Sequence, residues 1–307
     1  MTISQPSAQS SAQADARDRR IGLVFAVLCS LGLGLAVASS RIAYEGGTNP
    51  VSVAMMRGWF GVALLGTVCL IGGRSLVFPV ARWPSVLFLG VLMAHMNFGN
   101  IAAVNYIAVG LGALLFFVYP PLVSLFTALL DRRRPSLIKL LAVLGAFAGL
   151  VVMLGAGSGE VDMTGVLLGL TAGIACAVNI TYVSRYMREI DPLTLVFYMT
   201  LVAAVIQTTV SVSSGYLTFP TMASGWWGAA IVVVCQASSI PLYYLAISKI
   251  GAEKSAVINN LQPVASIVAA WILYGELLTP ERWVGAVMVL GGILLMQWGD
   301  LRARRTG

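Results

Sequence analysis

The residues of this chain best suited to chemistry are polar side chains set inside long apolar runs. Asn259, Asn260 and Gln262 are followed at once by Pro263, in the apolar run that precedes the polar stretch "GELLTPER". A soluble protein would seldom bury three amides beside a proline in one helix. In a membrane, neighbouring helices or a water-filled cavity satisfy the backbone groups that a proline frees. The pattern therefore predicts part of the wall of a pathway through a bilayer.

Polar and aromatic stripes of this kind recur in other apolar runs. The side chains predicted to line a substrate-binding cavity are His95, Asn97, Asn100, Tyr119, Asn179, Tyr182, Tyr198, Gln236, Tyr243, Asn259 and Gln262. Any one stripe could simply bond neighbouring helices, a common use of amides in lipid. Their recurrence favours a polar central cavity, where tyrosines present an apolar wall with a polar tip. Pro120 and Pro263 are the predicted bending points of their helices.

His95 is the only histidine and lies in the middle of an apolar run. Ionisable groups at membrane depth are functional candidates. One interpretation is a proton-sensitive or substrate-contacting group, and the other is a histidine bonded to a neighbouring helix. At 100° per residue His95 falls roughly opposite Asn97. The two therefore share one narrow channel only if the helix is kinked near Gly99.

Two arginines at the ends of apolar runs allow two interpretations. Arg57 lies about one turn into its run and could snorkel to the membrane interface or form a structural pair. It could instead anchor a substrate carboxylate, because arginine binds carboxylates through a bidentate fork. Arg41, at the end of the first run, is expected to snorkel.

The elements that position these residues are predicted to be membrane-spanning helices. Hydrophobic residues make up 58% of the 307 residues and charged residues 10%, against roughly 25% charged in soluble domains. A helix needs about 20 residues to cross a bilayer. The ten predicted spans cover residues 21–43, 50–72, 84–104, 109–130, 136–155, 164–184, 192–213, 224–246, 253–274 and 281–299.

Basic residues indicate the orientation of these spans. With a cytoplasmic N-terminus, every lysine and arginine except Arg41, Arg57 and Arg282 falls on the inner side, as the positive-inside rule requires. We therefore expect a multi-pass inner-membrane protein with both termini cytoplasmic. The net charge of +7 forms no single patch, so we expect the bilayer and a small-molecule substrate as partners, and no nucleic acid. Nothing in the sequence indicates an oligomeric state.

The two halves of the chain repeat one another. "TNPVSVAMM" parallels "IDPLTLVFY", Tyr106-Ile107-Ala108 parallels Tyr244-Leu245-Ala246, and Pro120 pairs with Pro263. Five helices per repeat is an odd number, so the halves must have opposite orientations in the membrane. Inverted repeats are typical of transporters, with the substrate site near the repeat interface. The predicted fold is all-α, with ten transmembrane helices as two inverted five-helix repeats.

The repeats also divide the chain. We expect a disordered cytoplasmic tail at 1–20, repeats at 21–155 and 164–299, and a basic cytoplasmic tail at 300–307. The alternative for the first span is a secretory signal ending at Ala36-Val37-Ala38. The second half contains a counterpart of this span, which favours a membrane helix that stays in the mature protein over a cleaved signal.

The ordered set of motifs around the ninth span resembles the drug/metabolite transporter superfamily, in particular its ten-helix EamA-type members. The features that carry the resemblance are "YLAI", Pro263, Gly275-Glu276, Thr279 followed by Gly285, and Gly291-Gly292. The first half departs from it, with "DRRRPS" where the family commonly has Gly-Glu. The resemblance implies a polytopic inner-membrane carrier, often an exporter of amino acids or other small metabolites. Related members carry nucleotide sugars or sugar phosphates.

Enzyme chemistry and cofactors find no support in the sequence. The four cysteines have no CxxC or Cys/His spacing, which argues against zinc, haem and thiol catalysis. An intramembrane lipid-modifying enzyme would want paired acids, a metal cluster or a Ser/His set. "GAEKS" lacks the spacing of a phosphate loop. We therefore predict a non-enzyme without metal or cofactor, driven by a gradient.

The predicted function is secondary active or facilitative transport of small metabolites, most of all amino-acid export, across the bacterial inner membrane by alternating access. The alternatives are a carrier of nucleotide sugars or phosphorylated metabolites and, less favoured, an intramembrane lipid-modifying enzyme. A carrier of dianions would want several buried Lys or Arg side chains, and only Arg57 is a candidate.

Overall fold

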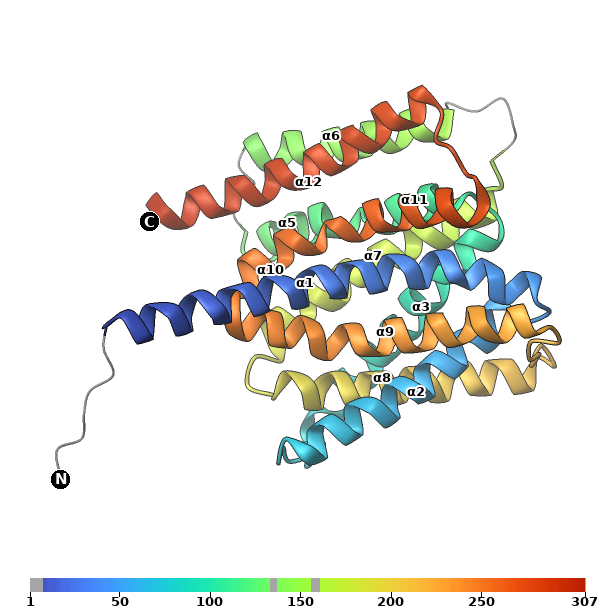
Figure 1. Ribbon diagram of the computed structural model, residues 1–307, viewed down its shortest axis with the longest axis horizontal. Helices are drawn as coiled ribbons and strands as arrows, with labels where there is room; N and C mark the ends of the chain where they lie inside the picture. The colour runs from blue at the N-terminus through green and yellow to red at the C-terminus, as the bar shows by residue number, and fades with distance from the viewer. Residues whose placement is uncertain (1–7, 133–136, 156–160, 307) are drawn as a thin grey trace.

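The computed structural model describes the backbone of residues 8–132, 137–155 and 161–306, and this part of the chain is helical with short connections (Figure 1). The α-helices are α1 (Ala8–Glu45), α2 (Pro50–Ile71), α3 (Trp83–Ala102), α4 (Val109–Phe116), α5 (Tyr119–Leu130), α6 (Leu137–Gly155), α7 (Met163–Tyr186), α8 (Pro192–Ser213), α9 (Ala223–Ile250), α10 (Ala252–Asn259), α11 (Leu261–Tyr274) and α12 (Pro280–Thr306). Short 3-10 helices, η1 (Val80–Arg82) and η2 (Ala103–Asn105), flank α3.

The prediction of an all-helical membrane protein is confirmed. Among the described residues, eight stretches are long and apolar enough to cross a membrane, and they correspond to the predicted first to fourth and sixth to ninth spans. The predicted fifth span is α6, whose described apolar stretch, Val143–Val152, is shorter. The tenth is α12, whose side chains from residue 296 onward lie outside the described residues. The count of ten stays a prediction.

The sequence parallel at Asn49-Pro50 and Asp191-Pro192 is a matched pair of helix starts. The Asn49 side chain accepts a hydrogen bond from the backbone nitrogen of Ser52 at 2.9 Å, and Asp191 accepts one from Thr194 at 3.0 Å. Each cap satisfies a backbone N–H at the start of its helix, and proline fits the first helical position because its missing N–H would have no partner there. The two halves thus begin their second helix in the same way.

The N-terminal segment differs from the predicted disordered tail. The structure begins α1 at Ala8, so residues 8–20 are helical, and residues 1–7 lie outside the described residues. A physical reason is that helix nucleation is costly while extension is not. A membrane helix already formed can extend into polar residues that would not nucleate a helix alone. At the other end α12 is described to Thr306, within the predicted basic tail.

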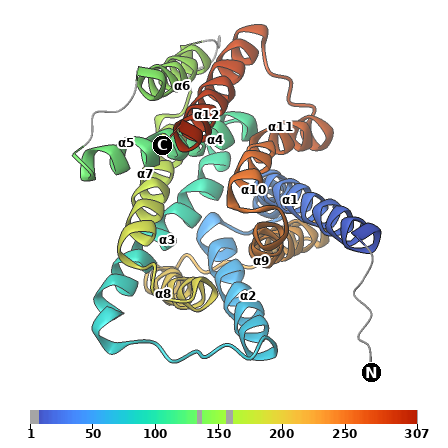
Figure 2. The same cartoon turned by 90° about the vertical axis from the view of Figure 1, so that its left-hand side faces the viewer.

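Helix packing follows the two-fold relation that an inverted repeat requires. In order along the chain, α1, α2, α3, α4–α5 and α6 of the first half correspond to α7, α8, α9, α10–α11 and α12 of the second. When each helix is exchanged for its counterpart, the contact of α1 with α9 becomes that of α7 with α3. The contact of α2 with α9 becomes that of α8 with α3, and all four contacts are present. The contacts of α1 with α11 and of α7 with α4 and α5 form another equivalent pair. The contacts of α2 with α8, α4 with α11 and α6 with α12 each join a helix to its own counterpart in the other half. Seen from the end where α1 begins, α6 and α12 lie together to one side of the bundle, away from α2, α8 and α9 (Figure 2).

Two of the predicted spans are broken in the middle. The span predicted at 109–130 divides into α4 and α5, with Pro120 and Pro121 in the first turn of α5. The span predicted at 253–274 divides at Asn260 into α10 and α11, with Pro263 in the first turn of α11. The sequence predicts bends at these prolines, and just before each the structure has a short turn that is still hydrogen-bonded to the preceding helix. A proline in a first turn is tolerated because that turn's N–H groups lack intrahelical partners.

Candidate substrate-binding site

The two interruptions meet through side chains. The Tyr119 side chain, at the start of α5, lies near Asn259, the last residue of α10. Ser30 of α1 joins them, because its Oγ lies 3.1 Å from the Ile258 carbonyl oxygen and 3.5 Å from Asn259 Oδ1. Tyr243 of α9 and Cys176 of α7 lie near Tyr119. We call Ser30, Tyr119, Tyr243 and Asn259 the polar centre.

The polar centre contains three of the predicted site residues: Tyr119 of α5 in the first half, and Tyr243 and Asn259 of the consecutive helices α9 and α10 in the second. Tyr119 and Asn259 are half-buried, although they lie between several helices. A polar group at the end of a broken helix can bind a substrate, because the break leaves backbone groups without intrahelical partners. Ser30 was missed by the sequence argument. The sequence feature that could have indicated Ser30 is its spacing of four residues from Gly34, which places both on one face of α1.

Two other predicted residues lie beside the polar centre. Gln262, in the first turn of α11, is buried where α1 and α11 approach closely: a Cβ added to Gly34 would lie 2.8 Å from the Gln262 carbonyl oxygen. Ser266 Oγ donates to the Gly34 carbonyl at 3.2 Å across the same contact. Gln236 is half-buried on α9, one turn before Ser239. Ser239 Oγ lies 3.3 Å from the Cys29 carbonyl of α1, next to Ser30.

Tyr182 and Tyr198 are not brought to the polar centre. The Tyr198 hydroxyl donates to the Leu76 carbonyl at 2.5 Å, and its ring lies 5.4 Å from that of Trp83. Tyr182 shares a hydrogen bond of 3.0 Å with Ser85 Oγ and lies 4.9 Å, ring to ring, from Tyr186. Both tyrosines therefore sit near the connection between α2 and α3. Aromatic rings with one polar tip are typical of the membrane–water interface.

His95 also lies away from the polar centre. It continues the exposed apolar stripe of Phe88 and Val91 along α3, and its Nε2 lies 3.1 Å from Thr171 Oγ1 on α7. Because the Thr171 hydroxyl proton is donated to the Leu167 carbonyl at 2.6 Å, the contact assigns the Nε2 proton to the histidine. This geometry matches the interpretation of His95 as a histidine bonded to a neighbouring helix. As the helical wheel predicts, it points away from the buried amides of α3.

The remaining amides bond helix backbones. Asn179 Nδ2 donates to the Leu89 carbonyl at 3.1 Å, and Gln207 Nε2 donates to the Ala94 carbonyl at 3.2 Å. Both bonds tie the second half to α3, the use that amides commonly have in lipid. Asn97 is half-buried on α3, and its carbonyl accepts a hydrogen bond from Arg57 at 2.8 Å. Asn100 is buried one turn further along.

A second polar feature was missed by the sequence argument. A cavity of about 600 Å³ opens at the end of the bundle opposite the start of α1. We call it the Arg41 cavity; it is lined by Arg41, Tyr44, Glu45, Thr48, Asn49, Pro50, Val104, Asn105, Tyr106, Ile107, Ala108 and Glu276. Both signs of charge are present, so it can hold a polar or zwitterionic molecule.

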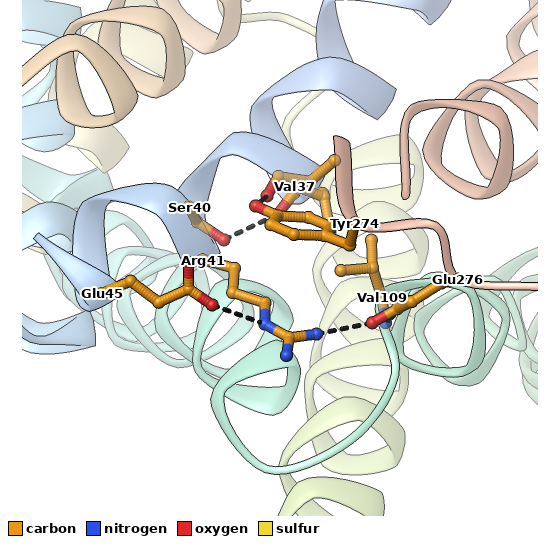
Figure 3. Close-up of polar contacts among 8 residues, drawn as sticks. Val37, Ser40, Arg41, Glu45, Val109, Tyr274 and Glu276 are labelled. Atoms are coloured by element: carbon orange, nitrogen blue, oxygen red, sulfur yellow. Dashed lines mark hydrogen bonds and ion pairs between the residues drawn. The ribbon is translucent and has the colours of Figure 1, made fainter. Parts of the chain in front are cut away.

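One ion pair at this cavity joins the two halves, and a second lies within α1 (Figure 3). Arg41 Nη1 lies 2.5 Å from Glu276 Oε1, and Arg41 Nε lies 3.2 Å from Glu45 Oε1. The other Glu276 oxygen accepts from the Val109 backbone nitrogen at 3.2 Å, at the start of α4. The Arg41 guanidinium also lies 4.9 Å from the centre of the Tyr274 ring. The prediction that Arg41 simply snorkels is wrong, because Glu276 places a carboxylate within its reach.

Gly275 explains how Glu276 reaches Arg41. It ends α11 with φ of 66°, a left-handed conformation that glycine adopts without strain. The chain therefore turns sharply just before Glu276 and presents the carboxylate to α1 and α4. A Gly-Glu pair after an apolar helix could have indicated this from sequence.

The two ends of the bundle differ. At the Arg41 cavity α4 packs against α11 and the ion pairs join α1, α4 and the α11–α12 connection. At the end where α1 begins, α5 and α10 lie apart (Figure 2). Two related halves, with two interrupted helices and polar groups between them, are the architecture typical of membrane carriers.

Comparison with known proteins agrees with that class. The EamA-like transporter family matches residues 20–155 and again residues 163–298, so the chain belongs to this family. The double match fits two repeats. The threonine/homoserine exporter RhtA of Escherichia coli K12 is 27% identical over 245 residues, covering 77% of this chain and 78% of its own. The uncharacterized transporter YvbV of Bacillus subtilis is 25% identical over 286 residues, covering 90% and 91%.

A solved crystal structure shares the fold, with a TM-score of 0.63 over 95% of this chain and 99% of its own, at 20% sequence identity. The chain is therefore a multi-span membrane protein of a transporter family. This membership supports the prediction that it is a transporter and not an enzyme. Among the described residues no group of three or more His, Cys, Asp or Glu side chains is arranged to hold a metal ion.

Proposed function

We propose that this protein exports small metabolites, with amino acids as the first substrate class, by alternating access around the polar centre. The observation that carries the proposal is the meeting of the two broken helices at Tyr119 and Asn259. Each half contributes one broken helix. A rocking motion of the halves would therefore open the same polar groups to one side of the membrane and then to the other.

The orientation belongs to the same proposal. The first turns of α1, the α2–α3 connection and the end of α7 carry Arg19, Arg74, Arg82 and Arg185, whereas the Arg41 cavity lies at the opposite end. The positive-inside rule then makes the termini cytoplasmic, in the inner membrane. In this orientation the described conformation is closed on the outside by the Arg41 ion pairs, with α5 and α10 apart on the cytoplasmic side.

Amino acids are the favoured substrates for two reasons. A relative that covers most of the chain is a threonine/homoserine exporter. The polar centre itself offers hydroxyl and amide groups and no fixed charge, which suits a small polar molecule better than a phosphorylated one. A nucleotide-sugar or sugar-phosphate carrier would need several buried cations. Among the described residues Arg57 is the one charged side chain that is fully buried.

The proposal is tested by counterflow of labelled L-threonine, L-homoserine and other amino acids in proteoliposomes, with and without an imposed pH gradient. We expect saturable transport of a subset. Tyr119→Phe and Asn259→Ala should each lower it by at least about tenfold, because a hydrogen bond to a charged substrate contributes about 1.5–3 kcal/mol.

Tyr182→Phe is the matched control, since it removes the same hydroxyl from a tyrosine away from the polar centre. It should transport as the unaltered protein does. Unchanged transport in both polar-centre variants would remove this cluster from the pathway. Transport of none of the amino acids would exclude the substrate class and leave the carrier fold in place.

A further inference from the structure

Arg57 is a charged side chain buried inside the bundle. It lies two turns into α2, about 10 Å along the helix axis from Pro50, which lines the Arg41 cavity. Only 4% of its surface is exposed. Its Nη2 donates to the Asn97 carbonyl of α3 at 2.8 Å. A snorkelling side chain would reach the interface, so this position does not fit that interpretation.

Among the residues that the structure describes, no carboxylate forms an ion pair with Arg57. The ion pairs found within the described residues use Arg41, Arg74, Arg82, Arg185 and Lys249 as their cations. Burying an ion without a counter-ion carries a large cost in free energy, even when one hydrogen bond is made. A guanidinium has five N–H donors in a planar fork. The hydrogen bond to the Asn97 carbonyl uses one of these donors, and others of the fork could be accepted by an anion.

A second group nearby also lacks a partner. Asn100 follows Asn97 by one turn on α3, and its Oδ1 is buried without a hydrogen bond from any described residue. A buried acceptor without a donor costs free energy that a ligand's N–H can recover. The Arg57 guanidinium on α2 can donate to a carboxylate, and Asn100 Oδ1 on α3 can accept from an ammonium group. Together they match the two charged groups of a zwitterion.

Tyr44 separates this pair from the Arg41 cavity. Its ring lines the cavity, its hydroxyl donates to the Ile101 carbonyl of α3 at 3.0 Å, and it lies near Arg57. Arg57 thus lies just beneath the end of the bundle that the Arg41 ion pairs close. Opening of that end would expose the guanidinium to the cavity.

We infer that Arg57 binds the carboxylate of the transported zwitterion, with Asn100 accepting from its ammonium group. The inference rests on the proposed function, because it assigns a second contact on the pathway from the polar centre to the Arg41 cavity. It makes a free carboxylate a requirement of the substrate. The bidentate geometry of arginine makes lysine a poor replacement.

Binding is measured apart from transport, by the thermal unfolding temperature of the detergent-solubilised full chain. The probes are L-threonine and L-threoninamide, which differ only at the carboxylate. We expect L-threonine to raise the unfolding temperature and L-threoninamide to leave it nearly unchanged. In Arg57→Gln the shift with L-threonine should be lost, and Arg57→Lys should need at least about tenfold more ligand for the same shift.

The unliganded variants separate binding from folding. Because the charge of Arg57 is uncompensated, empty Arg57→Gln should unfold at a temperature equal to or above that of the unaltered protein. A lower unfolding temperature in both Arg57→Gln and Arg57→Lys would mean a structural role and overturn the inference.

Equal shifts by the two probes, an undiminished shift in Arg57→Gln, or no shift by either probe would also overturn it. Failure of the proposed function would give a different result, namely no counterflow by the unaltered protein.

Discussion

Tyrosines of this chain lie in different surroundings although each sits in a similar apolar run. Tyr119 lies near Asn259 where the two interrupted helices meet. Tyr198 donates to a backbone carbonyl beside Trp83 and Phe78 at the end of the bundle. Amphipathic rings suit either place, because one edge is apolar and the hydroxyl needs a partner. At the scale of single residues, function follows from the partner and not from the residue type.

Asp191 gives a pH-dependent prediction at the same scale. Burial raises the pKa of its carboxyl, but hydrogen bonds from Thr194 and the charge of Arg74 outweigh that effect and hold the pKa below its ordinary value. A lowered pKa stabilises the folded state above the unfolded pKa of about 3.9, and this stability is lost as the pH falls through the folded pKa. Asp191→Asn should therefore flatten the fall in unfolding temperature below about pH 4.

The measurement is a series of thermal melts between pH 3 and pH 7. Because asparagine also caps helices well, the variant should change little in cap strength at neutral pH. Glu189→Gln is the control, since Glu189 is exposed and lies 3.6 Å from Arg82 outside the cap. An identical acid response in Asp191→Asn and the unaltered protein would contradict the prediction.

At the scale of elements, close helix contacts set the position of the broken helices. A Cβ on Gly34 would lie 2.6 Å from the Ala265 Cβ and 2.8 Å from the Gln262 carbonyl oxygen, so α1 and α11 touch through backbone. Small residues allow such approach in membranes. The same contact holds the first turn of α11, and with it Pro263, against α1. The polar centre therefore depends on a glycine that carries no chemistry.

Gly34→Ala should lower the free energy of unfolding by about 1–3 kcal/mol, because the added methyl group must push two backbones apart. The matched control is Gly145→Ala in α6, where an added Cβ would meet nothing within 4 Å. That change should be neutral or stabilise by up to about 1 kcal/mol through helix propensity. Chemical denaturation in detergent gives both values. Equal effects at the two glycines would contradict the close-contact argument.

At the scale of the whole molecule, the ends of the bundle differ in how they are closed. Arg41 links α1 to Glu276, which in turn accepts from the start of α4. These groups are partly exposed, so each ion pair contributes on the order of 1 kcal/mol or less. A small free energy suits a closure that the proposed transport cycle requires to open. These contacts would favour the conformation in which this end is closed without preventing it from opening.

Glu276→Gln should open the Arg41 cavity more often. With the native cysteines replaced by alanine and Val104→Cys added, at a buried position of the cavity lining, an impermeant maleimide applied outside cells should react about fivefold faster, the rate equivalent of about 1 kcal/mol. Glu45→Gln breaks only a pair within α1 and should have a smaller effect. No labelling from outside would contradict the proposed orientation. Equal rates in Glu276→Gln and the unaltered protein would contradict the role in closure.

The sequence by itself determined the helical membrane class, the eight spans that the structure also has, and the paired helix starts at Asn49 and Asp191. It also located both breaks to within a turn through Pro120 and Pro263, although as bends. These features depend on residues close together in the chain: apolar length, a cap and a missing N–H act locally. The wheel likewise separated His95 from Asn97, because both lie on one helix.

Only the tertiary structure decided which polar side chains meet. Periodicity gives the angle between two residues of one helix, but not the direction in which the helix faces its neighbours. Tyr119 and Asn259 therefore looked no different from Tyr198 and Asn179 until helices from the two halves were packed together. The packing of helices against one another also brings Arg41 to Glu276 and buries Arg57 near Tyr44. Contacts between distant segments are fixed by how helix surfaces fit, which no local pattern records.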